Sequence, residues 1–512
     1  MVALQQSLTP TILATASLTG VALHLFFFKQ VEVDKRPAST AASFVVAYFL
    51  IANALPRISS EYEGFFWLYT VAFLAWSSLV LSLWTSILVY RAFFHPLKNF
   101  PGPFCARLSK FWSLSKVLET NIRWYRALDA LHEQYGDLVR TGPRELVIFD
   151  AAAITPVLGF ASVTGKGPFY GLMETSVNTT SDRAFHRKRR KVWDNAFKIS
   201  LADYAPRVEE FTSQLLVRIG NNLGKPILPN EICIHYSYDG DSNDIAKSVL
   251  DNIQKGVDAI GLLLHWNEYS EALVIQRKNM KNPKPDLFSH LLDNTEDTAA
   301  GRSLLNSECR LIVGAGSDTT ATALTFLLVN FALYPEWLQR LRDEVDPIFA
   351  DSDFNCARTQ PVLDAVINES MRLSPSVLFG SQRETPPEGM RIGDTFIPGG
   401  TIIPIPAYQV GRDERNFIHA TKFLPERWYS KPELIIKNAH MPFLTGPFNC
   451  AGRNLAMMEL RSVVARVAHE FDIAFPPGSS FDADDYFGRI KDHFVSGAPP
   501  QNPIFTKRRR VA

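Results

Sequence analysis

The sequence lacks several features that would assign it to common protein classes. It has no excess of charge, since 53 basic residues face 52 acidic ones, and this balance gives no field that would attract nucleic acid. It has only five cysteines, odd in number and far apart, which favours a reducing compartment over a disulfide framework. We also find no internal repeat. What remains is a chain of 512 residues, long enough for one large domain or two ordinary ones.

Charge is also missing from long stretches of the first 90 residues. Asp, Glu, Lys and Arg are all absent from three windows, which are residues 1–28, 37–56 and 64–90. Each window is apolar and long enough to cross about 30 Å of hydrocarbon. We therefore expect a membrane anchor at residues 1–92, with three transmembrane helices at about 8–28, 37–56 and 65–90. Asn53 and the terminal Pro56 leave a re-entrant or interfacial second segment as an alternative, which would reduce the anchor to two crossings or one.

The basic residues around these windows indicate the orientation. The first charge, Lys29, follows the first apolar run, whereas a cleaved signal peptide would place basic residues before it. Three basic residues follow the first window, one follows the second and four follow the third. This count places the first loop and the main domain in the cytosol.

The remaining chain, residues 93–512, reads as one domain that is mostly α with small β-sheets. It begins with the proline-dense stretch HPLKNFPGP at 95–103, expected to be a stiff, non-helical spacer. The stretch WYRALDALHEQYG has the apolar spacing of a helix and ends at Gly136. Two β-prone runs then flank Gly142-Pro143, as in a hairpin. A second strand-rich patch covers residues 390–408, and most of the later segments are helical.

The stretch FLTGPFNCAGRNLA at 443–456 holds Cys450 between Gly446 and Gly452. A cysteine thiolate is the ligand that pushes electron density onto a haem iron. The glycines permit tight turns that let a flat macrocycle lie against the chain, and a helix beginning near Arg453 would direct its N-terminal dipole at the sulfur. A buried cysteine beside a turn is the alternative for this motif alone.

The apolar run at 311–335 predicts a helix in which Ala315 and Thr319 share one face. Gly314 and Gly316 thin the helix there, so that a small ligand could approach. Asp318 and Thr319 could together relay protons to bound oxygen. A fourth membrane span is the alternative, but Asp318 and the flanking charges favour a buried core helix.

Two further groups are charged. Glu369 and Arg372 share a helical face, and with Arg427 they could form a carboxylate held by two guanidiniums, although such a motif alone is usually a surface pair. The second group is DRAFHRKRRKVWDNAF, whose His186 and Arg190 share a face suited to cofactor carboxylates. Its other basic residues, Arg187, Lys188, Arg189 and Lys191, would face an acidic partner. A nucleic-acid patch is the alternative, against which the interleaved aromatics weigh. The nearby GFASVTGKG at 159–167 fails as a phosphate loop, because Gly167 stands where Ser or Thr must hold the metal.

With these motifs in hand, residues from about 95 to 510 resemble a cytochrome P450 of the membrane-bound type found in fungal secondary metabolism. The resemblance rests on AGSDTT, NESMR, PERW and FLTGPFNCAG, in that order. It implies Cys450 as the axial ligand of haem b, Thr319 and Asp318 as the proton-delivery pair, and Glu369, Arg372 and Arg427 as a structural triad. It also implies a set of cofactor-binding residues, which are His186, Arg190, Ala315, Gly316, Arg383, Phe443, Gly446 and Gly452.

The chain departs from the family pattern in two places. Phe448 occupies the position of a basic residue in the cysteine loop, which puts one contact to a haem propionate in doubt, although its ring could shield the sulfur from water. The region from about 239 to 290 looks shorter than in relatives, where it roofs the substrate cavity. It is either a reduced lid or a gene-model error.

The resemblance implies a monooxygenase that oxidises a mainly apolar small molecule in the endoplasmic reticulum membrane, with its catalytic domain in the cytosol. Its electrons would come from NADPH through a cytochrome P450 reductase in the same membrane, and no nucleic acid is expected as a partner. The alternatives are a haem-thiolate isomerase, dehydratase or peroxygenase, against which Asp318 and Thr319 argue, and a membrane scaffold that keeps the fold without turnover.

Overall fold

The computed structural model describes residues 8–30, 37–58, 64–238, 271, 274–280, 286–437, 439–479 and 481–509. The chain divides into two compact units, which we describe separately. The first is Met1–Trp112 with Arg140–Arg144, and the second is Ser113–Val139 with Glu145–Ala512. Most of the sequence region that looked shortened, 239–290, lies outside the described residues.

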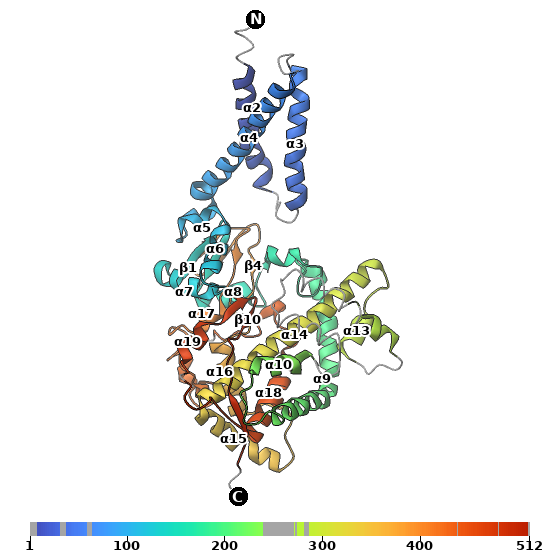
Figure 1. Ribbon diagram of the computed structural model, residues 1–512, viewed down its shortest axis with the longest axis vertical. Coiled ribbons are helices and arrows are strands. Elements are labelled where there is room, and N and C mark those ends of the chain that lie inside the picture. The colour runs from blue at the N-terminus through green and yellow to red at the C-terminus, as the bar shows by residue number, and fades with distance from the viewer. Residues whose placement is uncertain are drawn as a thin grey trace. The chain divides into compact units, whose positions relative to one another are not determined.

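Three long apolar helices make up most of the first unit (Figure 1). Its helical segments are α2 (Leu8–Leu23), the π-helical η1 (His24–Phe28), α3 (Pro37–Ile58), α4 (Phe65–Val89), the π-helical η4 (Tyr90–Phe94), the 3-10 turn η5 (Pro96–Asn99) and α5 (Phe104–Leu108). Helices α2 and α4 pack closely because position 20 is glycine, where a Cβ would lie 2.1 Å from Ser82 Oγ. The indole Nε1 of Trp76 on α4 donates to the carbonyl of Phe44 on α3 at 2.9 Å.

These helices match the three apolar windows. Helical stretches at Thr9–Phe28, Ala38–Ile58 and Phe65–Phe94 are each long and apolar enough to cross a membrane. The second runs two residues beyond Pro56, where the sequence pattern placed its end. The proline-dense spacer is not wholly non-helical as expected, because Pro96 occupies the first position of η5, where its missing N–H costs no hydrogen bond.

Helices dominate the second unit, which confirms the mostly α fold. They begin with α6 (Phe111–Glu119), which crosses the unit boundary, and continue with α7 (Trp124–Tyr135), η6 (Ala151–Ala153), α8 (Ile154–Leu158), η7 (Pro168–Leu172), α9 (Arg183–Gly220), α10 (Pro229–Tyr238), α13 (Leu287–Asp293), α14 (Ala299–Leu333), α15 (Pro335–Ala350), α16 (Pro361–Leu373), α17 (Ala407–Gly411), η8 (Pro425–Trp428), η9 (Pro432–Leu434), η10 (Gly446–Phe448), α18 (Arg453–Glu470) and α19 (Ala483–Gly488). The α7 helix ends at Gly136, whose φ of 84° suits a residue without a side chain.

The strands form small sheets, as the sequence predicted. They are β1 (Leu138–Gly142), β2 (Glu145–Ile148), β3 (Gly165–Lys166), β4 (Arg383–Glu384), β5 (Met390–Ile392), β6 (Thr395–Ile397), β7 (Ile402–Ile403), β8 (Phe471–Ala474), β9 (Lys491–His493), β10 (Val495–Gly497) and β11 (Ile504–Lys507). One five-stranded sheet has the order β1-β2-β7-β4-β3, and three strand pairs complete the set. Strands β1 and β2 flank Gly142-Pro143, at the position of the expected hairpin.

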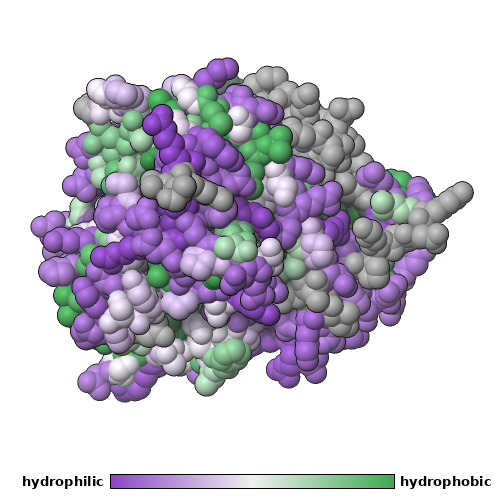
Figure 2. All heavy atoms as spheres, turned by 90° about the horizontal axis from the view of Figure 1, so that it is seen from below, coloured by the Kyte–Doolittle hydropathy of each residue, from purple (hydrophilic) through white to green (hydrophobic). Residues whose placement is uncertain are grey.

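The core of the second unit surrounds α14. This helix is long and apolar enough to be a fourth candidate span, yet Leu324, Leu327 and Leu328 are fully buried in a cluster shared with α10, α16 and α18. Its neighbours in Figure 1 are these same helices. The face of the molecule that carries α15 and the C-terminus is mainly hydrophilic, with scattered apolar residues (Figure 2). We therefore describe α14 as the central helix of a water-facing unit.

Candidate functional site

The loop that carries Cys450 is held by its own backbone. The Cys450 amide donates to the carbonyl of Phe443 at 2.9 Å, and the Asn449 amide donates to that of Gly446 at 3.2 Å. Gly446 has a φ of 73°, and a Cβ there would lie 1.9 Å from the carbonyl oxygen of Leu158. Only glycine fits this position. The bend therefore places Cys450 three residues before α18, in a loop whose shape depends on Gly446.

Opposing effects act on the Cys450 thiol. Burial raises its pKa, whereas the backbone N–H groups of Gly452 and Arg453 and the charges of Arg190 and Arg453 lower it. The amides belong to the start of α18, where the helix dipole stabilises an anion. Although the chain surrounds the side chain, it remains accessible from one side. These surroundings suit a sulfur that becomes a thiolate when a positive centre binds it.

A cluster of basic residues surrounds the ring of Phe448. The ring centroid lies 4.5 Å from the His186 ring, 5.2 Å from Lys166 Nζ and 5.0 Å from the Arg383 guanidinium carbon. Lys166 and Arg383 stand directly opposite each other in the antiparallel pair β3–β4. Like charges in that position repel each other. The position that lacks the expected basic residue thus still lies among basic residues.

No carboxylate among the described residues forms an ion pair with Lys166 or Arg383. Arg383 is 1% exposed, and its Nε and Nη2 atoms are buried without a hydrogen-bond partner. Burial, followed by Arg383 and Arg190, lowers the pKa of Lys166 to about 7. Burial, followed by Lys166 and Arg190, likewise lowers that of His186 to about 4. A buried anion with at least two carboxylates would reverse these shifts and pair the orphaned guanidinium atoms.

The basic residues of α9 have three different roles. Arg190 donates from Nη1 to the Asn449 carbonyl at 2.6 Å and from Nη2 to Asn449 Oδ1 at 2.7 Å, so it fixes the residue before Cys450. Arg189 was expected to face outward with the other cations, and this expectation is wrong. It is buried and ion-paired with Glu308 of α14 at 2.5 Å, and Trp193 Nε1 donates to the same carboxylate. Arg187 and Lys188 are exposed.

The stretch of α14 around Thr319 exposes two small residues one turn before the threonine. Ala315 and Gly316 are exposed, and nothing lies within 4 Å of a Cβ built on Gly316. Thr319 Oγ1 donates to the Ala315 carbonyl at 2.6 Å, and the Thr319 carbonyl accepts from Ser376 Oγ at 2.8 Å. The hydroxyl and the small residues therefore belong to the same turn, as the spacing predicted.

The structure brings Glu369, Arg372 and Arg427 together. Arg372 binds the Glu369 carboxylate through two bonds of 2.7 and 2.9 Å, and Arg427 Nε donates to it at 3.1 Å. The Leu424 amide and Trp428 Nε1 fill its remaining acceptor positions at 2.8 and 2.9 Å. All three charged side chains are fully buried, so this is no surface pair.

The triad reaches the cysteine loop only indirectly among the described residues. Arg372 and Arg427 also bind backbone carbonyls between residues 411 and 434, which fixes that segment to α16. The Trp428 ring lies 4.6 Å from that of His440, which contacts Asn368 at 3.3 Å. Burial lowers the pKa of His440 to about 3, so the ring is neutral. From His440 the chain continues directly into the loop.

Sequence reasoning missed Lys166 and Asn449. Lys166 lies in the glycine-bounded GKG that fails as a phosphate loop, and the available signal was a lysine flanked by glycines in a β-prone stretch. Its ammonium donates to the Asn178 carbonyl and lies 4.8 Å from the Tyr170 ring. Asn449 gave no signal in the sequence, because its role depends on a helix 259 positions away.

The fold and site define a mostly helical protein with a thiol loop, a cation cluster and an apolar membrane anchor. The cytochrome P450 family model matches residues 244–493. The chain is 33% identical over 534 residues to cytochrome P450 monooxygenase FCK2 of Fusarium pseudograminearum, with 96% of each chain covered. It is 36% identical over 468 residues to cytochrome P450 monooxygenase orf5 of Eupenicillium brefeldianum, covering 84% of this chain and 95% of that one. It is also 31% identical over 548 residues to tryprostatin B 6-hydroxylase of Aspergillus fumigatus, covering 97% and 96%.

The chain therefore belongs to the cytochrome P450 family and is a haem-dependent monooxygenase of the type found in fungal secondary metabolism. The site fits the cofactor that this family implies. Haem carries two propionates, which match the buried Lys166 and Arg383, and two guanidinium nitrogens of Arg383 make no hydrogen bond with a described residue.

Proposed function

We propose that this protein inserts one oxygen atom from O2 into a mainly apolar small molecule, and that Cys450 would hold haem b through its sulfur. The observation that carries this proposal is the combination of an exposed thiol at Cys450 with buried basic residues nearby, of which Arg383 has two guanidinium nitrogens that make no hydrogen bond with a described residue. When bound, the haem supplies the iron at which O2 is activated. The protein supplies its attachment, the dry surroundings and the proton.

Two groups of residues would attach the haem, one at its propionates and one along its macrocycle. His186, Lys166 and Arg383 would bind the propionates, with Arg190 acting at the same edge through Asn449. Gly446, Gly452 and Phe443 allow the backbone to lie close to the macrocycle, and Ala315 and Gly316 leave room on the α14 side. Phe448 would exclude water from the propionate edge, since its ring already packs against Lys166, Arg383 and the His186 ring.

Proton delivery would use Thr319 and Asp318. The Thr319 hydroxyl donates to the Ala315 carbonyl, one turn before it on the face that carries the small residues. A hydroxyl held in this way can accept a proton from a neighbouring carboxyl group and pass its own onward. The triad of Glu369, Arg372 and Arg427 would take no part in the chemistry and would hold the segment that leads into the cysteine loop.

The electrons would come from NADPH through a cytochrome P450 reductase in the same membrane. The exposed cations of α9, which include Arg187, Lys188 and Lys191, give an acidic partner a local target on a chain with no net field. The anchor would be residues 1–92, in the endoplasmic reticulum membrane, with the catalytic domain of residues 93–512 in the cytosol. The three apolar helices and the positions of the basic residues support this arrangement.

Tracing the inserted oxygen with isotope tests the reaction class. Membranes that contain this chain and a reductase are supplied with NADPH and ¹⁸O2, and the extracted products of a fungal metabolite library are analysed by mass spectrometry. We expect one ¹⁸O atom in the product, with no product when the reductase is omitted. An isomerised or dehydrated product that forms without NADPH would instead support the isomerase or dehydratase alternative.

A further inference from the structure

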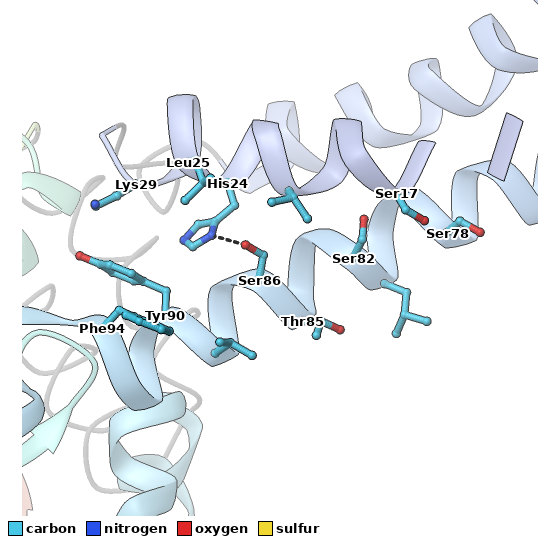
Figure 3. A pocket seen from close by; sticks show the side chains of 13 residues that line it. Ser17, His24, Leu25, Lys29, Ser78, Ser82, Thr85, Ser86, Tyr90 and Phe94 are labelled. Atoms are coloured by element: carbon cyan, nitrogen blue, oxygen red, sulfur yellow. Dashed lines mark hydrogen bonds between the residues drawn. The ribbon is translucent and has the colours of Figure 1, made fainter. Parts of the chain in front are cut away.

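A groove of about 750 Å³ lies between α2 and α4 in the first unit, within the size range of small-molecule sites. It lies in the membrane anchor, so it takes no part in the proposed chemistry. Figure 3 shows the His24 ring of η1 directed at Ser86 of α4, with Lys29 and Tyr90 at one end of the groove and Ser17 and Ser78 at the other.

The polar lining of this groove is unusual for helices of this kind. His24 is only 3% exposed, and its Nδ1 atom is hydrogen-bonded to Ser86 Oγ at 2.7 Å. Inside a bilayer no bulk water is at hand, so a buried ionisable ring there indicates a functional site.

One end of the groove carries a cation packed against an aromatic ring. Lys29 Nζ lies 4.8 Å from the centroid of the Tyr90 ring, and no carboxylate among the described residues is within ion-pair distance of it. The His24 and Tyr90 rings contact edge to face at 5.5 Å. An ammonium, an imidazole nitrogen and a phenol therefore meet at one point, which is suited to a phosphate group and its ester oxygens.

Both helices change their geometry where this end begins. The α2 helix continues as the π-helix His24–Phe28, and α4 continues as the π-helix Tyr90–Phe94. π-Helical turns are rare and frequently mark functional sites. Here two of them flank the same group of polar side chains, and the close contact at Gly20 holds the helices together further along.

The length of the groove matches one leaflet of a bilayer. From Ser17 to Lys29, a helix rises about 18 Å at 1.5 Å per residue, which is somewhat more than half of the roughly 30 Å of hydrocarbon. The other lining residues include Val21, Leu25, Leu81 and Val89, which suit an acyl chain. We propose that this groove binds one glycerophospholipid with an anionic headgroup, its phosphate at Lys29 and His24 and one acyl chain between α2 and α4.

Native mass spectrometry of the full-length, haem-loaded chain tests this site. The protein is released from detergent micelles that contain equal amounts of phosphatidylserine and phosphatidylcholine, and bound lipid is counted. We expect one phosphatidylserine to persist in preference to phosphatidylcholine. Lys29→Gln should weaken its binding about fivefold, as expected for one basic residue at the surface of an anionic membrane. His24→Phe keeps the ring but removes both nitrogens, and it should also weaken binding.

The control is Lys98→Gln, which removes an exposed cation of the same unit outside the groove and should leave lipid binding unchanged. The haem absorbance of each variant shows that it is folded. A phosphatidylserine analogue with a photoreactive acyl chain should crosslink to α2 and α4. Equal retention of both lipids, equal losses in Lys29→Gln and Lys98→Gln, or a second polypeptide bound in the groove would overturn the proposal.

Discussion

Lys166 occupies surroundings that disfavour its own charge. Burial and the neighbouring arginines lower its pKa from 10.5 to about 7. Because the folded pKa lies below the unfolded one, the unfolded chain binds more protons between these values, and the stability of the haem-free protein rises as pH increases from about 7 to about 10.5. A propionate would remove this penalty. The residue would thus favour the cofactor-bound form over the haem-free fold.

Lys166→Met should therefore have opposite effects on the two forms. The haem-free chain should become more stable below pH 7, whereas haem should dissociate at least about tenfold faster, since a charged hydrogen bond contributes roughly 1.5–3 kcal/mol. Urea unfolding of the haem-free chain and transfer of haem to apomyoglobin measure the two effects. Lys188→Met, which removes an exposed cation of α9, is the control. Loss of stability together with unchanged haem transfer would place Lys166 outside the propionate site.

Thr319 is the residue whose loss should uncouple NADPH consumption from product formation. Thr319→Ala removes the hydroxyl that donates to the Ala315 carbonyl, and we expect haem content to stay normal while product per NADPH falls at least about tenfold. The missing reducing equivalents should appear as peroxide. Thr320→Ala is the control, because the neighbouring hydroxyl is buried and bonded to Glu459. If both variants couple NADPH to product as the unmodified chain does, Thr319 has no role in the relay.

At the scale of elements, α9 shows one helix serving the core, the cofactor edge and the surface. Its buried Arg189 and exposed Arg187 are two positions apart, so they lie on different faces. Arg189 binds Glu308 and the carbonyl of Asn294, and it therefore ties α9 to α14. Among the described residues, the exposed Arg187 has no ion-pair partner to lose.

Arg189→Met and Arg187→Glu should separate these roles. The first leaves Glu308 buried without its partner and should lower the free energy of unfolding by about 3–5 kcal/mol. The second should leave stability unchanged but slow reduction by the reductase, most strongly at low salt, where charges are least screened. Chemical denaturation and stopped-flow reduction at two salt concentrations measure both. Equal stability of the two variants would contradict the assignment of Arg189 to the core.

The positions of helices and strands could be predicted from the sequence, whereas the face that each one buries could not. Glycine chemistry marked the end of α7 at Gly136 and the turn between β1 and β2, and helical spacing put His186 and Arg190 on one face. Whether Arg189 points inward depends on Glu308, which is 119 positions away and cannot be found by local periodicity. The same holds for Lys166, whose role depends on the cross-strand register with Arg383.

At the scale of the whole molecule, the boundary of the anchor is a structural question. The sequence pattern ends the anchor at residue 92, whereas the first compact unit continues to Trp112 and includes Arg140–Arg144. The reason is Arg140, which is fully buried and whose amide donates to the Pro101 carbonyl at 2.7 Å. Residues 93–112 are thus joined to a strand that lies beyond α7 in the chain.

Two nested truncations test this boundary. A chain that begins at residue 93 loses the apolar helices but keeps the bond between Pro101 and Arg140, so it should bind haem and leave the membrane pellet. A chain that begins at residue 113 also loses the partner of the Arg140 amide and should bind less haem, because a buried unpaired group costs roughly 1–3 kcal/mol. Haem absorbance per protein and sedimentation with membranes are measured. Equal haem content in both truncated chains would show that haem binding does not need residues 93–112, and that the anchor unit ends before Pro101.

The central claim is that Cys450 supplies the thiolate to the haem, and the reduced, CO-bound absorption spectrum tests it most directly. The unmodified chain should show the Soret band of a thiolate-ligated haem, and Cys450→Ser should lose this band and all turnover even where some haem is retained. Cys105→Ser, at an exposed cysteine of α5, should behave like the unmodified chain. A Cys450→Ser protein that keeps the thiolate band would contradict the account.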